Sequence, residues 1–146
     1  MPITYSILPD LGLVLVRFEG EVRTDEHVES FLAYAADPRF DGRQDVLLDL
    51  EAGSFNMSNF EEIQVLAYRL KGYYAVRDPG SKTSIWAPGD VTFGMCRMYQ
   101  SIAEVSGSLK VGVFRTREET MGYLGFAPGV ARTRQLIAAW NAARPS

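Results

Sequence analysis

The chain has few of the residues that build metal sites and disulfides. It contains one cysteine and one histidine in 146 residues. A single cysteine cannot form a disulfide within the chain, which is typical of proteins from a reducing compartment. A single histidine excludes clusters of histidine ligands, and any Ser-His-Asp triad would have to use that one residue. The sequence therefore predicts no disulfide, no metal centre and no cofactor.

Long apolar runs and an excess of basic charge are also missing. No run approaches the roughly eighteen apolar residues of a membrane-spanning helix, and the opening segment MPITYSILPD lacks the basic region and apolar core of a signal peptide. The formal net charge is −3, so no global field attracts a phosphate backbone. We therefore expect a cytoplasmic protein that neither inserts into a membrane nor binds nucleic acid.

The composition that is present indicates one folded domain. Apolar residues make up 47% of the chain and charged residues 23%, values that are typical of globular proteins. Alternating and continuous apolar runs predict strands, and apolar residues spaced by three and four predict helices. The predicted strands are residues 3–7, 13–22, 45–50, 83–87 and 109–114, and the predicted helices begin near residues 24, 59, 90, 116 and 129.

The order of these elements predicts an α/β fold. A turn at PDLG joins the first two strands into a β-hairpin, and strands separated by helices imply right-handed parallel crossovers. We predict a single-domain, mixed five-stranded sheet that begins with the hairpin, continues by βαβ crossovers and is followed by an extra C-terminal helix. The predicted domain spans residues 1–126, and residues 127–146 form a helical extension packed on it or on a partner.

Three segments carry a resemblance to a known family. FLAYAADPRFDGRQDVLLDL, APGDVTFGMCRMYQ and VGVFRTREETMGYL occur in this order, and together they resemble the SpoIIAA-like group of small bacterial proteins, which has the STAS fold. The resemblance covers about residues 2–126. It implies a non-enzymatic binding or regulatory domain that contacts a protein partner or a second copy of itself through the second helix and the turn before it.

Ser58 lies in that turn and has two interpretations. In phosphorylated STAS proteins a serine between the third strand and the second helix carries the phosphate, and the resemblance places Ser58 at this position. The segment SNFE is also a capping box, in which the hydroxyl accepts the backbone N–H of Glu61. A phosphate would benefit from the helix N-terminus but would face Glu61 and Glu62. The residues favour the cap, and the phosphorylation site is the alternative.

Polar and aromatic residues follow the predicted parallel strands. In open α/β sheets ligands collect beyond the carboxyl ends of the strands, where this chain carries Asp49, Trp86, Asp90 and Arg115, with Ser58 nearby. This rim is the predicted ligand site. The alternative function is accordingly a carrier or sensor of a small, partly apolar molecule or lipid, as in the related SEC14-like architecture.

Aromatic residues suggest a surface for a protein partner. Tyr73 and Tyr74 lie at the end of the second predicted helix, and Trp140 lies in the last one. Tyrosine and tryptophan are enriched in the centres of interfaces. We therefore predict a protein interface at these three residues and expect a homodimer, with packing of the last helix on its own domain as the alternative.

No residue carries a convincing signal for catalysis. His27 lies in the acidic segment TDEHVE and is expected to face solvent, and Cys96 is expected to behave as a small apolar residue of a helix. Asp49 and Glu51 are two residues apart on a strand and could converge as an acid and base pair. Ordinary polar residues at a strand end are the favoured interpretation, so no catalytic residue is predicted.

Overall fold

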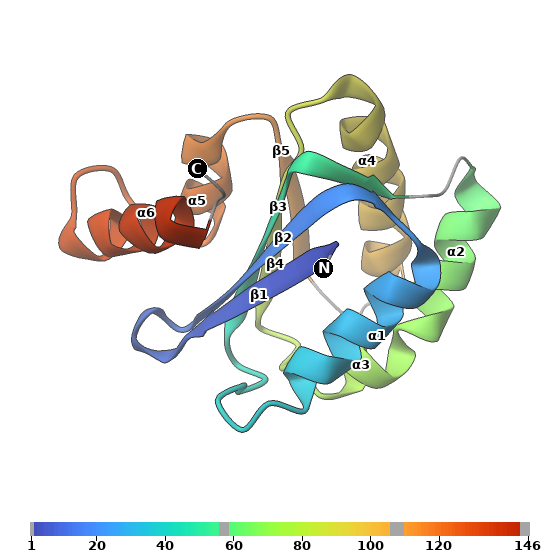
Figure 1. Ribbon diagram of the computed structural model, residues 1–146, viewed down its shortest axis with the longest axis horizontal. Helices are drawn as coiled ribbons and strands as arrows, with labels where there is room; N and C mark the ends of the chain where they lie inside the picture. The colour runs from blue at the N-terminus through green and yellow to red at the C-terminus, as the bar shows by residue number, and fades with distance from the viewer. Residues whose placement is uncertain (1, 56–58, 106–109, 144–146) are drawn as a thin grey trace.

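A mixed five-stranded sheet forms the centre of the protein, as a computed structural model shows over residues 2–55, 59–105 and 110–143 (Figure 1). The strands lie side by side in chain order, with the first pair antiparallel and all others parallel. The predicted α/β class and the predicted hairpin at its start are confirmed. The strands are β1 (Ile3–Leu8), β2 (Leu13–Val22), β3 (Asp45–Phe55), β4 (Lys82–Trp86) and β5 (Lys110–Phe114).

A short 3-10 turn, η1 (Pro9–Leu11), closes the hairpin between β1 and β2. Gly12 follows it with φ +61°, and its N–H donates to the carbonyl of Pro9 at 3.1 Å. This left-handed conformation is accessible to glycine at little cost because glycine has no Cβ. The PDLG signal in the sequence thus corresponds to a real turn.

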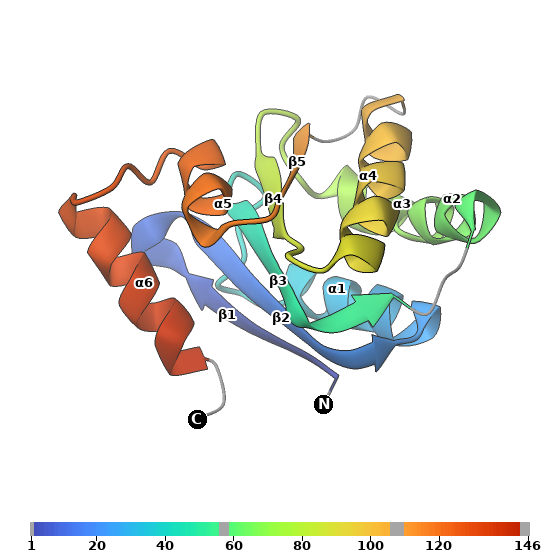
Figure 2. The ribbon, with the colours of Figure 1, turned by 90° about the horizontal axis from the view of Figure 1, so that it is seen from above.

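Helices cover both faces of the sheet, and their origins differ. Because the strands follow one another in chain order, right-handed crossovers place every connecting helix on the same face. Figures 1 and 2 show the connecting helices on that face and the helices that follow β5 on the other. The connecting helices are α1 (Thr24–Ala35), α2 (Phe60–Arg69), α3 (Lys71–Ala75) and α4 (Asp90–Val105), and those after β5 are α5 (Arg117–Tyr123) and α6 (Ala131–Ala143).

Two hydrophobic clusters lie on the two faces. β3 contributes to both, because successive side chains of a strand point to opposite faces. Val46, Leu48 and Leu50 belong to the cluster under α1 to α4, whereas Leu47 belongs to the cluster under α5 and α6. The continuous apolar run in β3 is therefore explained by a strand that is covered on both sides.

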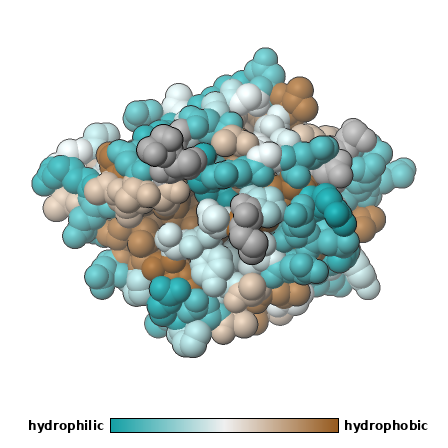
Figure 3. Space-filling view, in the orientation of Figure 1, coloured by the Kyte–Doolittle hydropathy of each residue, from teal (hydrophilic) through white to brown (hydrophobic). Residues whose placement is uncertain are grey.

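The C-terminal helix packs on its own chain. Leu136 and Trp140 of α6 are buried in the second cluster, beside side chains from the hairpin and β3. Val130 precedes α6 and is 46% exposed. Figure 3 shows hydrophilic residues over much of the face in view, with apolar side chains gathered over α6 and the neighbouring part of β1.

β2 and β3 extend as a two-stranded ribbon beyond the rest of the sheet. The last residue of β3 that pairs with β4 is Asp49, whereas β2 and β3 stay paired as far as Val22 and Phe55. Within the ribbon a Cβ on Gly53 would lie 2.5 Å from the Cβ of Phe18. Only glycine therefore permits the two strands to approach this closely.

In the part of the chain that the structure describes, no helix combines the length and the apolar character that crossing a bilayer would require.

Candidate functional site

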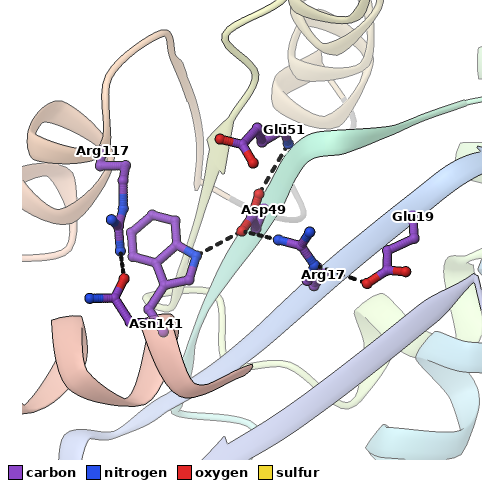
Figure 4. Close-up of polar contacts among 7 residues, drawn as sticks. Arg17, Glu19, Asp49, Glu51, Arg117 and Asn141 are labelled. Atoms are coloured by element: carbon purple, nitrogen blue, oxygen red, sulfur yellow. Dashed lines mark hydrogen bonds and ion pairs between the residues drawn. The ribbon is translucent and has the colours of Figure 1, made fainter. Parts of the chain in front are cut away.

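A buried carboxylate lies at the end of the part of β3 that pairs with β4. Asp49 is fully buried, and its Oδ2 accepts hydrogen bonds from the indole Nε1 of Trp140 at 2.8 Å and from Nη1 of Arg17 at 3.1 Å (Figure 4). Its Oδ1 accepts the backbone N–H of Glu51 at 3.0 Å. A buried charge is stable only when it is paired and hydrogen-bonded, and these contacts meet that requirement.

Arg17 connects the buried carboxylate to the surface. The two residues are direct neighbours in the register of β2 and β3, and Arg17 is 6% exposed. Its Nε also donates to Glu19 at 3.2 Å, and Glu19 is an exposed residue (Figure 4). The guanidinium therefore bridges one buried and one exposed carboxylate. Glu51, predicted as a potential partner of Asp49 in an acid and base pair, is exposed and contributes its backbone N–H.

Two tryptophans contribute to the packing of α6 on the sheet. The rings of Trp86 and Trp140 meet edge to face at 5.4 Å, and Trp86 donates through Nε1 to the carbonyl of Arg115 at 3.0 Å. The guanidinium of Arg117 lies 4.2 Å from the Trp140 ring and donates to Asn141 at 3.0 Å. Trp140 thus contacts Asp49 of β3 and Arg117 of α5. This cluster of side chains stabilises the docking of α6 on the sheet.

The predicted ligand residues separate into an internal pair and a surface pair. Asp49 and Trp86 are register partners on β3 and β4, and both are buried under α6. Asp90 and Arg115 form an exposed ion pair at 2.6 Å, and the Arg115 guanidinium lies 4.2 Å from the ring of Phe93. Both pairs are at the carboxyl ends of the strands, as predicted, but their polar groups are bound within the chain. Asp49 accepts from Arg17 and Trp140, Trp86 donates to the carbonyl of Arg115, and Asp90 pairs with the Arg115 guanidinium. The fifth residue, Ser58, lies outside the described residues.

The tyrosines predicted at an interface are buried within the chain. Tyr73 is 1% exposed and Tyr74 9% exposed, and their hydroxyls bond to those of Tyr34 and Tyr99 respectively. Desolvation raises the pKa of Tyr73 above its usual value. Trp140, the third predicted interface residue, is 1% exposed. These three side chains form the interior of the protein and offer no surface to a partner.

Sequence reasoning missed a buried arginine next to the tyrosines. Arg77 is 5% exposed and donates to Oγ1 of Thr83 at 2.5 Å, to the carbonyl of Lys82 at 3.0 Å and to that of Gln44 at 3.4 Å. It therefore connects the chain after α3 to the beginnings of β3 and β4. The segment RDPGSK contains residues typical of a turn, and nothing local marks an arginine that is buried by distant strands.

His27 is buried, and the expectation that it faces solvent is wrong. It is 3% exposed and packs against the rings of Phe18, Phe31 and Phe55 at 5.1, 4.4 and 5.5 Å. Burial lowers its pKa to about 3, so the imidazole is neutral at physiological pH. Its Nδ1 has no hydrogen-bond partner among the described residues.

A small internal cavity lies next to His27. Its volume is about 10 Å³, and its polar lining comes from His27, Tyr73, Thr83 and Tyr99. A polar cavity of about this size holds at most one water molecule. The cavity can therefore accommodate a structural water but no organic ligand in this conformation.

A larger hollow opens at the opposite end of the sheet from the predicted rim. It has a volume of about 620 Å³ and lies near the amino ends of β2 and β3. Arg39 and Arg43 lie on it and are each held by an aspartate two residues earlier, at 3.0 and 2.8 Å. The lining residues are Pro9, Gly12, Pro38, Arg39, Phe40, Asp41, Arg43 and Gln44.

These ion pairs fix the charges beside the hollow. Hydrogen bonds from Arg39 and Arg43 lower the pKa values of Asp37 and Asp41 to about 2. Both aspartates are therefore charged at neutral pH, and each compensates one arginine. The hollow combines prolines and a phenylalanine with fixed charges of both signs.

The start of α2 differs from the predicted cap. The helix begins at Phe60, and its cap is Asn59, whose Oδ1 accepts the backbone N–H of Glu62 at 2.9 Å. The capping role that the sequence suggested for Ser58 therefore belongs to its neighbour. Asparagine is as effective as serine at this position.

The outer side of α2 exposes apolar residues. Val65 is 55% exposed and Tyr68 72% exposed, and Phe60 at the start of the helix is 45% exposed. Glu61, Val65 and Tyr68 are spaced by four and three residues, so they lie along one side of the helix. We call these three residues the outer face of α2. The opposite side is buried in the first hydrophobic cluster through Ile63 and Leu66.

No protein-family model matches the sequence, and no similar sequence is found among curated proteins. Within residues 2–55, 59–105 and 110–143, no three histidine, cysteine or acidic side chains are grouped as a metal site would require.

Proposed function

We propose that the chain is a non-enzymatic binding or regulatory domain of the STAS type, acting through contact with another protein or with a second copy of itself. The observation that carries this proposal is the outer face of α2, where Val65 and Tyr68 are more than half exposed. The outer side of a surface helix is normally polar. Two large apolar side chains on adjacent turns therefore favour a surface that is covered in the functional state.

The composition of this surface fits a protein contact. Tyrosine is among the residues that contribute most to binding energy when it becomes buried at an interface. Acidic residues at the start of α2 and Lys71 after its end surround the apolar centre, which corresponds to the polar rim of known interfaces. The sheet order and the three family-like segments support the STAS part of the proposal, in which this helix is the contact surface.

The proposal is tested by photocrosslinking in the host cell. A benzophenone amino acid introduced at Tyr68 should form crosslinks to protein on irradiation, because its side chain is exposed on the proposed contact surface. The matched control is the same amino acid at Val91 of α4, which is 77% exposed and should give few crosslinks. Equal yields at the two positions, or none at Tyr68, would contradict a contact through α2.

The second candidate function is a carrier of a small, partly apolar ligand. The observation that favours it is the hollow beside Arg39 and Arg43, whose volume of about 620 Å³ lies within the range of ligand sites, about 300–1,000 Å³. Native mass spectrometry of protein from its own host should then show extra mass that is lost on denaturation. The double variant Arg39→Ala/Arg43→Ala should reduce the fraction of chains that carry this extra mass. A spectrum of the unmodified chain without extra mass would remove support for a carrier.

A further inference from the structure

The charges near α2 are arranged with opposite signs at its two ends. Glu61 and Glu62 are in the first turn, whereas Arg69 ends the helix and Lys71 begins α3. The exposed Val65 lies between these ends. A helix with this arrangement is complementary to a copy of itself that runs in the opposite direction, because each acidic end then meets a basic end.

A two-fold axis through the middle of the outer face also matches the apolar residues. If the axis passes between Val65 and Tyr68, the valine of each copy lies against the tyrosine of the other. Glu61 is four residues before Val65, and Lys71 is three residues after Tyr68. The same axis therefore brings Glu61 of one copy towards Lys71 of the second copy.

The positions of the two basic residues assign them different roles. Arg69 already forms an ion pair with Asp25 of α1, at 2.7 Å. The ammonium of Lys71 lies 5.1 Å from the centre of the Tyr68 ring, so it is next to the apolar centre of the outer face. Lys71 is thus the cation placed to meet an incoming carboxylate.

We propose that the outer face of α2 is a self-complementary interface, in which two copies of the chain pack their α2 helices antiparallel. This inference rests on the proposed function and names its partner, a second copy. Val65 and Tyr68 form the centre, and Glu61 and Lys71 form reciprocal ion pairs at the rim. A contact limited to one helix per copy falls below about 1,200 Å² of buried surface, so the dimer is reversible and dependent on concentration.

The test is a charge exchange, followed by sedimentation equilibrium of the full chain at low salt. Either single change, Glu61→Lys or Lys71→Glu, places like charges together at both ends of the interface. Each should weaken the dimer about tenfold. The double variant restores the opposite pairing with the two signs exchanged, and its dissociation constant should return to that of the unmodified chain.

Two further variants keep the inference falsifiable. Tyr68→Ser removes the exposed ring and should abolish the dimer, whereas Val91→Ala, at an exposed valine of α4, should not affect it. Circular dichroism establishes that each variant is folded. If a charge variant fails to fold, Tyr68→Ser decides alone, and a dimer that withstands it overturns the inference.

The outcomes separate this inference from the function on which it rests. A chain that stays monomeric at all concentrations, or a double variant as weak as the single ones, overturns the antiparallel dimer. Crosslinks from Tyr68 to a different protein, with none to a second copy, overturn the dimer but keep the proposed contact surface. Absence of any crosslink at Tyr68 contradicts the proposed function itself.

Discussion

The two faces of the sheet are covered by helices with different connections, and they bury polar groups in different ways. Under α1 to α4 the buried polar groups include the tyrosine hydroxyls, Arg77 and the neutral His27. Under α5 and α6 they include Asp49, which is bound by Arg17 and Trp140. One face therefore buries a neutral histidine and an arginine bound to neutral acceptors, and the other buries an ion pair.

Connectivity explains why the second face needs this ion pair. α1, α2 to α3, and α4 each join two neighbouring strands, so the chain itself holds them against the sheet. α6 follows β5, and no strand follows it within the described residues. Its docking therefore depends on side-chain contacts. The polar ones include the hydrogen bonds from Trp140 to Asp49, from Arg117 to Asn141 and from Arg132 to the carbonyl of Leu11.

The largest effect is expected where that ion pair is broken. Asp49→Ala leaves the guanidinium of Arg17 buried without its main partner, and breaking a buried pair costs about 3–5 kcal/mol. Urea unfolding followed by tryptophan fluorescence measures the loss in the free energy of unfolding. Asp90→Ala, which breaks the exposed pair with Arg115, is the control and should cost less than about 1 kcal/mol. Similar losses in the two variants would refute the proposed anchoring of α6.

The buried His27, on the face under α1 to α4, should make the free energy of unfolding depend on pH. The pKa of His27 is about 3 in the folded chain and about 6.5 when unfolded, so between these values the unfolded state binds a proton that the native state does not. The free energy of unfolding therefore falls as pH falls below 6.5, by about 1.4 kcal/mol per pH unit. Thermal or urea unfolding between pH 6.5 and 5 measures this slope.

His27→Phe is the matched variant for the pH dependence. It keeps an aromatic ring among Phe18, Phe31 and Phe55 and removes the titrating group, so its stability should change little between pH 6.5 and 5. The aspartates held by arginines have pKa values near 2 and lose their protons well below this window. A slope in the variant equal to that of the unmodified chain would show that another group causes it.

The sequence predicts the elements of the fold better than their buried polar contacts. The hairpin and the succession of strands and helices along the chain follow from local periodicity and turn residues. The burial of His27 could also have been predicted, since His27, Phe31 and Tyr34 are spaced by four and three residues on one side of α1. The neighbouring acidic residues instead suggested that this side is polar and exposed. The burial of Trp140 could not be predicted from local sequence, because it depends on which face of the sheet the crossover helices leave uncovered.

The partners of Asp49 show the same limit. A carboxylate inside the run VLLDL indicates a buried charge that needs a partner. Arg17 is 32 residues away and becomes that partner only through the register of β2 and β3. Trp140 is 91 residues away, on a helix that follows the last strand. Local sequence patterns contain no information on contacts between residues so far apart in the chain. Asp49 was therefore predicted as part of a ligand-binding rim and not as the partner of Arg17 and Trp140.

A smaller effect should distinguish the two tryptophans of the second face. Trp140→Phe removes a donor to a charged carboxylate and should cost about 2 kcal/mol in the free energy of unfolding. Trp86→Phe removes a donor to the neutral carbonyl of Arg115 and should cost about 1 kcal/mol from that bond. Both variants keep an aromatic ring, and urea unfolding compares them. A larger loss for Trp86→Phe would mean that ring packing outweighs the hydrogen bond to Asp49.

The smallest loss in the free energy of unfolding is expected at the cap of α2, on the face of the sheet that is covered by the crossover helices. Asn59→Ala removes the acceptor for the Glu62 backbone N–H and should lower the free energy of unfolding by about 1 kcal/mol. Ser58→Ala is the control, because the capping box in the sequence predicts the same loss at Ser58 instead. Thermal unfolding of the two variants decides which residue is the cap. If Ser58→Ala is the more destabilising change, the helix begins one residue earlier than the structure places it, and the serine hydroxyl is then engaged by the backbone.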